Sequence, residues 1–217
     1  MSHPLASLEP RALWSHFASI LEIPRPSKHE QRIAAWIRAQ AAERGWVVRA
    51  DAVGNLIVEV PPTRGRERAR PVILQSHLDM VCEKNRDVAH DFLRDPIRPR
   101  LAGEWVQATG TTLGADNGIG VATALAAATD PQVEHGPLEL LFTVDEETGL
   151  TGAAQLDGSL LRGRTLLNLD SEDDGKLYVG CAGGADSHLW LTLRRGAPAA
   201  GARPHSLAVG GLRGGHS

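Results

Sequence analysis

Short apolar runs with the length of buried strands alternate along this chain with segments of helical periodicity. Val72-Ile-Leu-Gln-Ser76 and Leu138-Glu-Leu-Leu-Phe-Thr-Val144 are the clearest of these runs, and each is bounded by polar residues, as buried strands often are. Strands interleaved with helices favour an α/β fold over an all-α or all-β fold. Further strands are expected at 46–50, 56–60, 165–169, 176–181 and 188–193.

Three segments of the chain are expected to be helical. Apolar residues recur from Leu13 to Leu21 with the spacing of an amphipathic helix. Ser27-Lys-His-Glu30 has the form of a capping box and predicts that a second helix begins there and stops at Gly45. The third helix is expected within the glycine-rich and then alanine-rich stretch 114–128.

The composition excludes several classes of partner. The chain has 217 residues, 42% of them hydrophobic and 23% charged, and its formal net charge is −3. This balance offers no basic surface for nucleic acid and no cationic face for anionic lipid, and no apolar run is long enough to span a membrane. Two cysteines, Cys82 and Cys181, are too few for a disulfide framework. We therefore expect a cytoplasmic globular protein that binds neither nucleic acid nor membrane.

Four groups of acidic, amide or histidine side chains occupy equivalent places, each after an apolar strand or at the opening of a helix. They are Ser76-His77-Leu-Asp79, Asp116-Asn117, Asp145-Glu146-Glu147 and Asn168-Leu-Asp170. Ligands of open α/β sheets bind outside the carboxyl ends of the strands, so the four groups are expected to meet in one pocket. Massed carboxylates disfavour one another's ionisation unless a cation neutralises them. Histidine with several carboxylates suits zinc or a similar divalent metal, and the set is large enough for two ions and metal-assisted hydrolysis.

Each group also has a simpler interpretation when it is taken alone. His77 and Asp79 alternate along a strand, so both side chains share a face through pleating alone. Asp116 is suited to a helix N-cap, and Asp145-Glu146-Glu147 to the first turn of a helix, where acids are favoured. The segment 170–174 reads as a solvated acidic turn. The metal-site interpretation rests on the occurrence of all four groups in order at strand ends.

Several long strings closely resemble the aminoacyl-histidine dipeptidases, also called Xaa-His or cytosolic non-specific dipeptidases. These enzymes are di-zinc metallopeptidases related to the carnosinases. The strings that carry the resemblance are Gln75-Ser-His77-Leu-Asp79-Met-Val-Cys-Glu-Lys-Asn85, Gly110-Thr-Thr-Leu-Gly-Ala-Asp116-Asn-Gly-Ile-Gly120, Phe142-Thr-Val-Asp-Glu146-Glu147-Thr-Gly-Leu-Thr-Gly152 and Leu167-Asn-Leu-Asp170. The likeness runs from Leu13 to Ser217 and implies a zinc-peptidase-like mixed sheet flanked by helices.

The resemblance also implies a role for each site residue. His77 and Asp170 would bind the first zinc, Asp116 would bridge two zinc ions, and Glu147 would bind the second; Co²⁺ or Mn²⁺ are able to substitute. Glu146 would be the general base that deprotonates the metal-bridging water and later protonates the leaving amine. Asp79 would hydrogen-bond the other nitrogen of His77 and fix its tautomer. The family also tends to have a cis peptide after the bridging aspartate, here between Asp116 and Asn117.

Domain organisation is a further implication of the resemblance. Residues 1–184 would form the amino-terminal part of the catalytic domain, and 185–217 the start of an α+β lid through which the full-length family dimerises. His216, in Gly214-Gly-His216-Ser217, resembles a lid histidine that binds substrate. The family's further histidine ligand for the second zinc lies towards the end of a chain about twice this length. We expect this chain to be an amino-terminal fragment, because its other histidines do not match that position.

Three functional hypotheses follow. The first is a metal-dependent dipeptidase that hydrolyses Xaa-His dipeptides of the β-alanyl-histidine type, with little activity in the isolated fragment. The second is a metal-binding remnant without turnover, which the incomplete second zinc site keeps open. The third keeps the di-zinc chemistry but changes the substrate to tripeptides or N-acyl amino acids.

Overall fold

The computed structural model describes residues 3–171, 173, 175–180, 188, 190, 192 and 196–206. The chain divides into two compact units, Met1–Asp170 and Ser171–Ser217, and the fold described below belongs to the first. The boundary at residues 184 and 185 stays a prediction. Cys181 and His216 lie outside the described residues, as do residues 189, 191 and 193 of the strand expected at 188–193.

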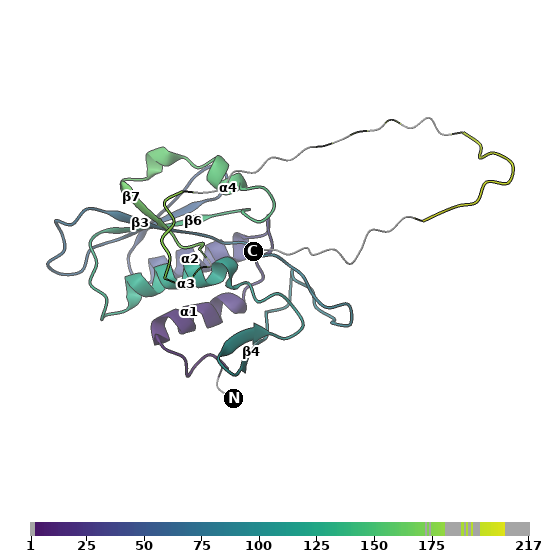
Figure 1. Cartoon of the computed structure of the whole chain (residues 1–217). Helices are drawn as coiled ribbons and strands as arrows, with labels where there is room; N and C mark the ends of the chain where they lie inside the picture. The colour runs from purple at the N-terminus through teal and green to yellow at the C-terminus, as the bar shows by residue number, and fades with distance from the viewer. Residues whose placement is uncertain are drawn as a thin grey trace. The chain divides into compact units, whose positions relative to one another are not determined.

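A mixed five-stranded sheet forms the centre of the first unit (Figure 1). Its order is β1 (Val47–Ala50), β2 (Leu56–Val60), β6 (Leu138–Thr143), β3 (Val72–His77) and β7 (Thr165–Asn168). The strands β3, β6 and β7 are parallel, whereas β1 and β2 are antiparallel to their neighbours. The carboxyl ends of the three parallel strands therefore lie at the same edge of the sheet, and the residues that follow them are brought together.

Helices cover one face of this sheet and build the main core. They are α1 (Arg11–Leu21), α2 (Gln31–Ala42) and α3 (Ala115–Thr129), which lie below the sheet in Figure 1. Their apolar stripes pack against alternate residues of β2 and β6, so that Phe17, Ile37 and Phe142 are fully buried. Burying one such side chain stabilises the fold by about 1.5–3 kcal/mol. This packing holds the sheet edge and the first turn of α3 in fixed positions.

The opposite face of the sheet has a smaller apolar cluster. Ile57, Ile73 and Leu141 point to this side because side chains alternate along a strand. The short helix α4 (Thr151–Ala154) and the 3₁₀ turn η1 (Gly158–Leu160) lie on this side in Figure 1. A separate hairpin is formed by β4 (Pro99–Ala102) and β5 (Trp105–Ala108).

The structure confirms the predicted α/β class, the three predicted helices and the five strands of the sheet. Two local predictions are wrong. The helix α2 begins at Gln31 without a capping box, because Ser27 and Glu30 bond to residues of the sheet edge instead of to each other. The expected strand at 176–181 is not formed by Lys176–Gly180, whose Leu177 and Val179 side chains are exposed; no described strand pairs with this segment.

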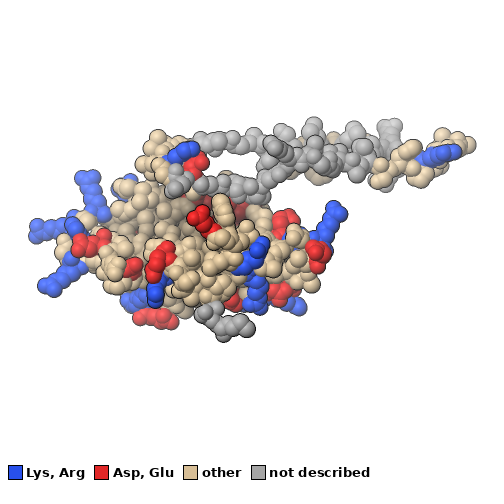
Figure 2. Space-filling view, turned by 60° about the horizontal axis from the view of Figure 1, so that its bottom comes forward, with Lys and Arg blue, Asp and Glu red and all other residues tan. Residues whose placement is uncertain are grey.

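Charges of both signs are interspersed on the face of the molecule shown in Figure 2, with several basic side chains grouped at its left edge. In the part of the chain that the structure describes, no helix combines the length and the apolar character needed to cross a bilayer.

Candidate metal centre

His77 is the last residue of β3 and is completely buried. Both of its ring nitrogens face carboxylates. Nδ1 lies 3.2 Å from Asp79 Oδ1, and Nε2 lies 2.9 Å from Asp116 Oδ1 and 3.6 Å from Asp170 Oδ1. The imidazole therefore has one nitrogen fixed by Asp79 and presents the other to the side chains of two further segments, as metal-binding histidines do.

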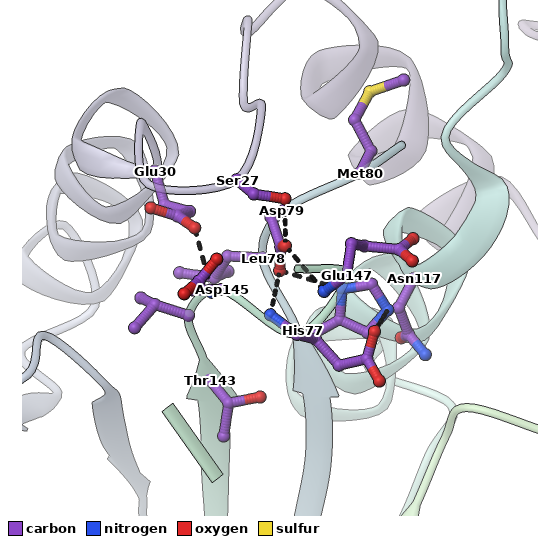
Figure 3. Close-up of polar contacts among 12 residues, drawn as sticks. Ser27, Glu30, His77, Leu78, Asp79, Met80, Asn117, Thr143, Asp145 and Glu147 are labelled. Carbon is purple, nitrogen blue, oxygen red and sulfur yellow. Dashed lines mark hydrogen bonds and ion pairs between the residues drawn. The ribbon is translucent and has the colours of Figure 1, made fainter. Parts of the chain in front are cut away.

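Asp79 is a buried carboxylate that accepts four hydrogen bonds (Figure 3). Besides His77, its donors are the hydroxyl of Ser27 at 2.7 Å and the backbone amides of Glu146 at 3.0 Å and Glu147 at 3.1 Å. Burial alone would raise its pKa, but the four donors favour the charged form and hold the pKa well below its usual value. Asp79 is thus an anion at every ordinary pH, and it joins β3 to the turn after β6.

Asp116 and Asp170 reach His77 from two other elements. Asp116 lies in the first turn of α3, where its backbone and that of Asn117 depart from helical angles. The peptide between them is cis, as the family resemblance leads one to expect. Asn117 Nδ2 donates to the backbone oxygen of Leu169 and to the carboxylate of Asp170. This amide holds the start of α3 against the end of β7, with both carboxylates directed to the imidazole.

Glu146 and Glu147 lie in the turn that follows β6. Asp145 begins the turn with a positive φ of 50°, and its carboxylate accepts hydrogen bonds from Thr148 and Thr151. Glu146 Oε2 is 3.9 Å from His77 Nε2. Glu146 is partly exposed, so it can contact both the cluster and a molecule entering from solvent.

The acids of the cluster perturb its titration. Burial lowers the pKa of His77, but the hydrogen bonds to Asp116 and Asp79 and the nearby negative charge of Asp170 outweigh burial and raise it to about 11. With this raised pKa, the His77 imidazole is protonated at neutral pH. A cation that binds His77 must displace the extra proton, so metal binding should release a proton. Burial raises the pKa of Glu146, and Asp170, Asp79 and Asp116 add to this rise although His77 opposes it. A carboxylate with a raised pKa holds a proton more readily than an ordinary one, which suits a group that must accept and return a proton.

The structure brings all six predicted residues of the first unit to one place, and it groups their ligand atoms in two ways. His77, Asp116 and Asp170 offer ligand atoms within 4.8 Å of one another, and His77, Glu146 and Glu147 form a second such group. Among the described residues, Asp116 and Glu147 do not share a group. Either group could hold a divalent cation, whereas the assignment of individual ligands and of a bridging aspartate stays a prediction.

Two residues outside the four predicted groups, Ser27 and Glu30, also shape the site. The Ser27 hydroxyl donates to Asp79 at 2.7 Å, and Glu30 accepts a hydrogen bond from the Asp145 amide at 3.0 Å. Within the predicted group, Asn168 Oδ1 accepts from the Asp170 amide at 3.0 Å. The sequence pattern predicts only a helix cap for Ser27 and Glu30. The pattern Ser-x-x-Glu gave no sign that both side chains bond to distant segments.

Comparison with known proteins identifies the family. The profile of peptidase family M20/M25/M40 matches residues 73–210. The cytosol non-specific dipeptidase of Escherichia coli (strain K12) is 52% identical over 213 residues, which cover 98% of this chain and 44% of that protein. This chain belongs to peptidase family M20/M25/M40. It spans less than half the length of that M20 relative.

Solved structures of similar proteins agree with the fold. The crystal structure of aminoacylhistidine dipeptidase from Vibrio alginolyticus matches with a TM-score of 0.80 and 50% identity, over 82% of this chain and 36% of that chain. Aminopeptidase PepT from Bacillus cereus matches with a TM-score of 0.63 and 25% identity, over 75% of this chain and 43% of that chain. The M20 chain described here therefore resembles part of each of these larger proteins.

Proposed function

We propose that this chain carries the principal metal-ligand cluster of a metal-dependent dipeptidase that hydrolyses dipeptides of the Xaa-His type. The observation that carries the proposal is the meeting of His77, Asp116 and Asp170 at the sheet edge, with ligand atoms within 4.8 Å, in a chain 52% identical to a dipeptidase. A relative named as an aminopeptidase is less similar, at 25% identity, so dipeptides are favoured over longer substrates.

The donor set supports zinc as the cofactor. One imidazole nitrogen and several carboxylate oxygens are ligands that Zn²⁺ accepts, and Co²⁺ and Mn²⁺ bind similar sets. The cluster also has more carboxylates than neighbouring cations, and a divalent ion would offset their mutual repulsion. We assign His77, Asp116 and Asp170 to a first ion and Glu147 to a second. When bound, the ions would acidify a water molecule and polarise the scissile carbonyl.

The remaining steps of hydrolysis fall to residues of this chain. Glu146, with its raised pKa and partial exposure, accepts the proton of the attacking water and later donates it to the leaving amine. Asp79 keeps a proton on His77 Nδ1, so that Nε2 faces the cluster as a ligand. The amides of Glu146 and Glu147 bond to the same carboxylate, which keeps the base at a fixed distance from the imidazole.

The direct test uses the whole protein, in the length that its gene encodes. Hydrolysis of β-alanyl-histidine is measured before chelation, after chelation with EDTA and after stepwise return of Zn²⁺. We expect chelation to abolish turnover and about two equivalents of Zn²⁺ per subunit to restore it. Turnover that survives complete removal of metal would refute the mechanism.

A metal-binding protein without turnover is the second candidate. Both ligand groups of the described residues depend on the same histidine, His77, so they do not offer separate histidines for two ions. Metal content separates the two for the 217-residue chain. We expect this chain alone to hold at most one ion firmly, at His77, Asp116 and Asp170, and to have negligible peptidase activity. If the whole protein also holds zinc but cleaves no di- or tripeptide, the second candidate replaces the first.

Location, assembly and the lid complete the proposal. We propose a cytoplasmic location because the Escherichia coli relative is named as cytosolic. Dimerisation through a lid that begins near residue 185, and substrate binding by His216, rest on the family resemblance. Sedimentation of the whole protein tests the dimer, and a KM increase in His216→Ala with zinc content unchanged tests the substrate role.

A further inference from the structure

Arg25 is the largest fully buried side chain of the described chain, at 1% exposure, and the mechanism above does not use it. It lies between α1 and α2, in the sequence Pro-Arg-Pro. No carboxylate of the described residues forms an ion pair with its guanidinium. It donates instead to backbone oxygens: Nη1 to Leu78 at 2.9 Å and to Asp79 at 2.7 Å, and Nη2 to Gly114.

These three oxygens belong to the two backbone segments that carry His77 and Asp116. Leu78 and Asp79 directly follow His77, and Gly114 precedes Asp116 by two residues. One planar guanidinium therefore joins the end of β3 to the turn that opens α3. The 2.9 Å contact between His77 Nε2 and Asp116 Oδ1 lies between the two segments thus joined.

Two glycines leave the space that the guanidinium fills. A Cβ atom on Gly114 or on Gly118 would lie 2.6 Å from Arg25 Nη2, closer than atoms in real structures approach. Gly114 also has a positive φ of 70°, which favours glycine in any case. Gly118 has no such conformational requirement, so its lack of a side chain is explained by the crowding around Arg25, with Phe17 also close.

The neighbours of Arg25 in the chain serve the same site. Ser27 donates to Asp79, and Glu30 accepts from the Asp145 amide, as Figure 3 shows. The segment Arg25–Glu30 thus contacts the residues after β3, the turn after β6 and the start of α3.

Arginine has the properties that this position requires. Burial lowers the pKa of Arg25 to about 10, while Asp79 and Asp116 oppose the fall, so the group stays charged at neutral pH. Its fixed fork of donors reaches carbonyls in two directions at once, whereas the point charge of a lysine cannot reproduce that geometry.

We propose that Arg25 is a positioning residue of the metal centre, which fixes the spacing of His77 and Asp116 by bridging their backbones. The proposal rests on the proposed function, because the spacing matters only if the cluster binds metal. Residues that orient metal ligands typically contribute about 10–100-fold to metal affinity.

The test compares metal affinity with fold stability. Zn²⁺ affinity of the whole protein is measured by competition with a chromogenic chelator, and the Co²⁺ form is examined by its visible absorption. Arg25→Lys is expected to bind Zn²⁺ about 10–100-fold more weakly and to shift the Co²⁺ bands, since the ligand geometry changes. Ile37→Ala, in the buried stripe of α2, is the matched control: it should lower the urea midpoint while leaving both metal readouts unchanged.

The outcomes separate the two proposals. Wild-type protein that binds neither Zn²⁺ nor Co²⁺ overturns the proposed function and the role of Arg25 together. Wild-type binding with unchanged affinity and Co²⁺ spectrum in Arg25→Lys overturns the role of Arg25 alone. The role of Arg25 is also overturned if Ile37→Ala and Arg25→Lys lose equal stability and weaken metal binding equally.

A second variant keeps the test decisive if Arg25→Lys does not fold. Gly118→Ala should displace the guanidinium and weaken Zn²⁺ binding in the wild-type background. In Arg25→Met, or in Arg25→Lys where that variant folds, the same change should have little further effect because the crowded group is gone. Independent effects would instead multiply. Unchanged Zn²⁺ affinity in Gly118→Ala contradicts the proposal, as does multiplication of the two effects.

Discussion

The two ends of β6 carry clusters of charged side chains, each built around buried residues, that are balanced in different ways. At its amino end, Glu139 is 3% exposed, and Arg49 bridges it and Glu59 at 3.5 Å and 2.7 Å. Arg162 also pairs with Glu59 at 2.9 Å, and the amides of Arg162 and Gly163 donate to Glu139. Two carboxylates therefore face two guanidinium groups, although they are opposite one another in neighbouring strands and would otherwise repel.

At the carboxyl end of β6, carboxylates gather around one imidazole. Asp79, Asp116, Glu146 and Asp170 all lie within 4 Å of a His77 ring nitrogen, and Arg25 faces backbone oxygens there. The amino-end cluster is neutralised by the chain itself, whereas the other has an excess of negative charge that a divalent cation would offset. A structural charge cluster and a candidate metal centre thus differ in charge balance more than in burial.

The largest expected difference between the clusters concerns turnover. Glu146→Gln in the whole protein should lower kcat by about 10²–10⁴-fold, because an amide cannot exchange the proton that general catalysis requires. Zinc content should be unchanged. Glu139→Gln, at the amino end of β6, is the control and should retain full turnover. Loss of zinc together with activity in Glu146→Gln would place Glu146 among the ligands and contradict its assignment as base.

The next effect concerns the carboxylate behind His77. Asp79→Asn should weaken Zn²⁺ binding by about 10–100-fold, since the amide no longer favours the required tautomer of His77. Competition with a chromogenic chelator measures this change. Ser27→Ala removes one of the four donors to Asp79 and should give a smaller effect in the same direction. Equal zinc affinity in Asp79→Asn and wild type would show that His77 is oriented by other contacts.

Charge removal at the balanced cluster should affect stability and leave metal binding unchanged. Glu139→Gln is expected to lower the free energy of unfolding by about 1–2 kcal/mol, because charged acceptors make the stronger hydrogen bonds to the Arg162 and Gly163 amides. Urea unfolding measures the loss, and chelator competition should give the wild-type zinc affinity. A changed zinc affinity would mean that the two ends of β6 are coupled, and the comparison would fail.

The smallest expected effect concerns a buried titratable group, His16, that stays neutral in the folded chain. Burial lowers the pKa of His16 to about 4, with a further contribution from Arg44, and its Nε2 contacts Thr129 Oγ1. The unfolded chain takes up a proton near pH 6.5 and the folded chain does not, so this contribution to stability is complete above pH 6.5 and falls as the pH drops towards 4.

His16→Gln should remove this dependence. Between pH 6.5 and 5.5, the wild type should lose about 1 kcal/mol or less relative to the variant, measured as the difference between urea unfolding free energies. Parallel curves for the two proteins would show that His16 titrates in the same way in both states.

The sequence predicted the sheet and the convergence of the site for a clear physical reason. The runs at 72–76 and 138–144 are apolar enough to indicate burial on both faces, and buried parallel strands place their following residues at one edge. His77, Asp145 and Asp170 could therefore be placed from local pattern alone.

The errors arose where tertiary contacts override a local pattern. Ser27 and Glu30 have the spacing of a helix cap, yet bonds to Asp79 and to the Asp145 amide engage them elsewhere. The β4–β5 hairpin was missed because its strands, Pro-Arg-Leu-Ala and Trp-Val-Gln-Ala, lack a continuous apolar run, and Trp105 is 72% exposed. Arg25 was missed because an arginine between prolines reads as a solvated loop, and only the fold shows that its partners lie more than 50 residues away.

Asp79 has one more consequence for how the site would respond to damage. Its Oδ1 accepts from both the His77 imidazole and the Glu146 amide, and its Oδ2 accepts from the Glu147 amide, so one carboxylate positions both a proposed ligand and the proposed base. Saturating an Asp79→Asn protein with zinc should therefore refill the metal site without restoring the wild-type kcat. Mass action restores metal occupancy, but it cannot realign Glu146 once that side chain is displaced.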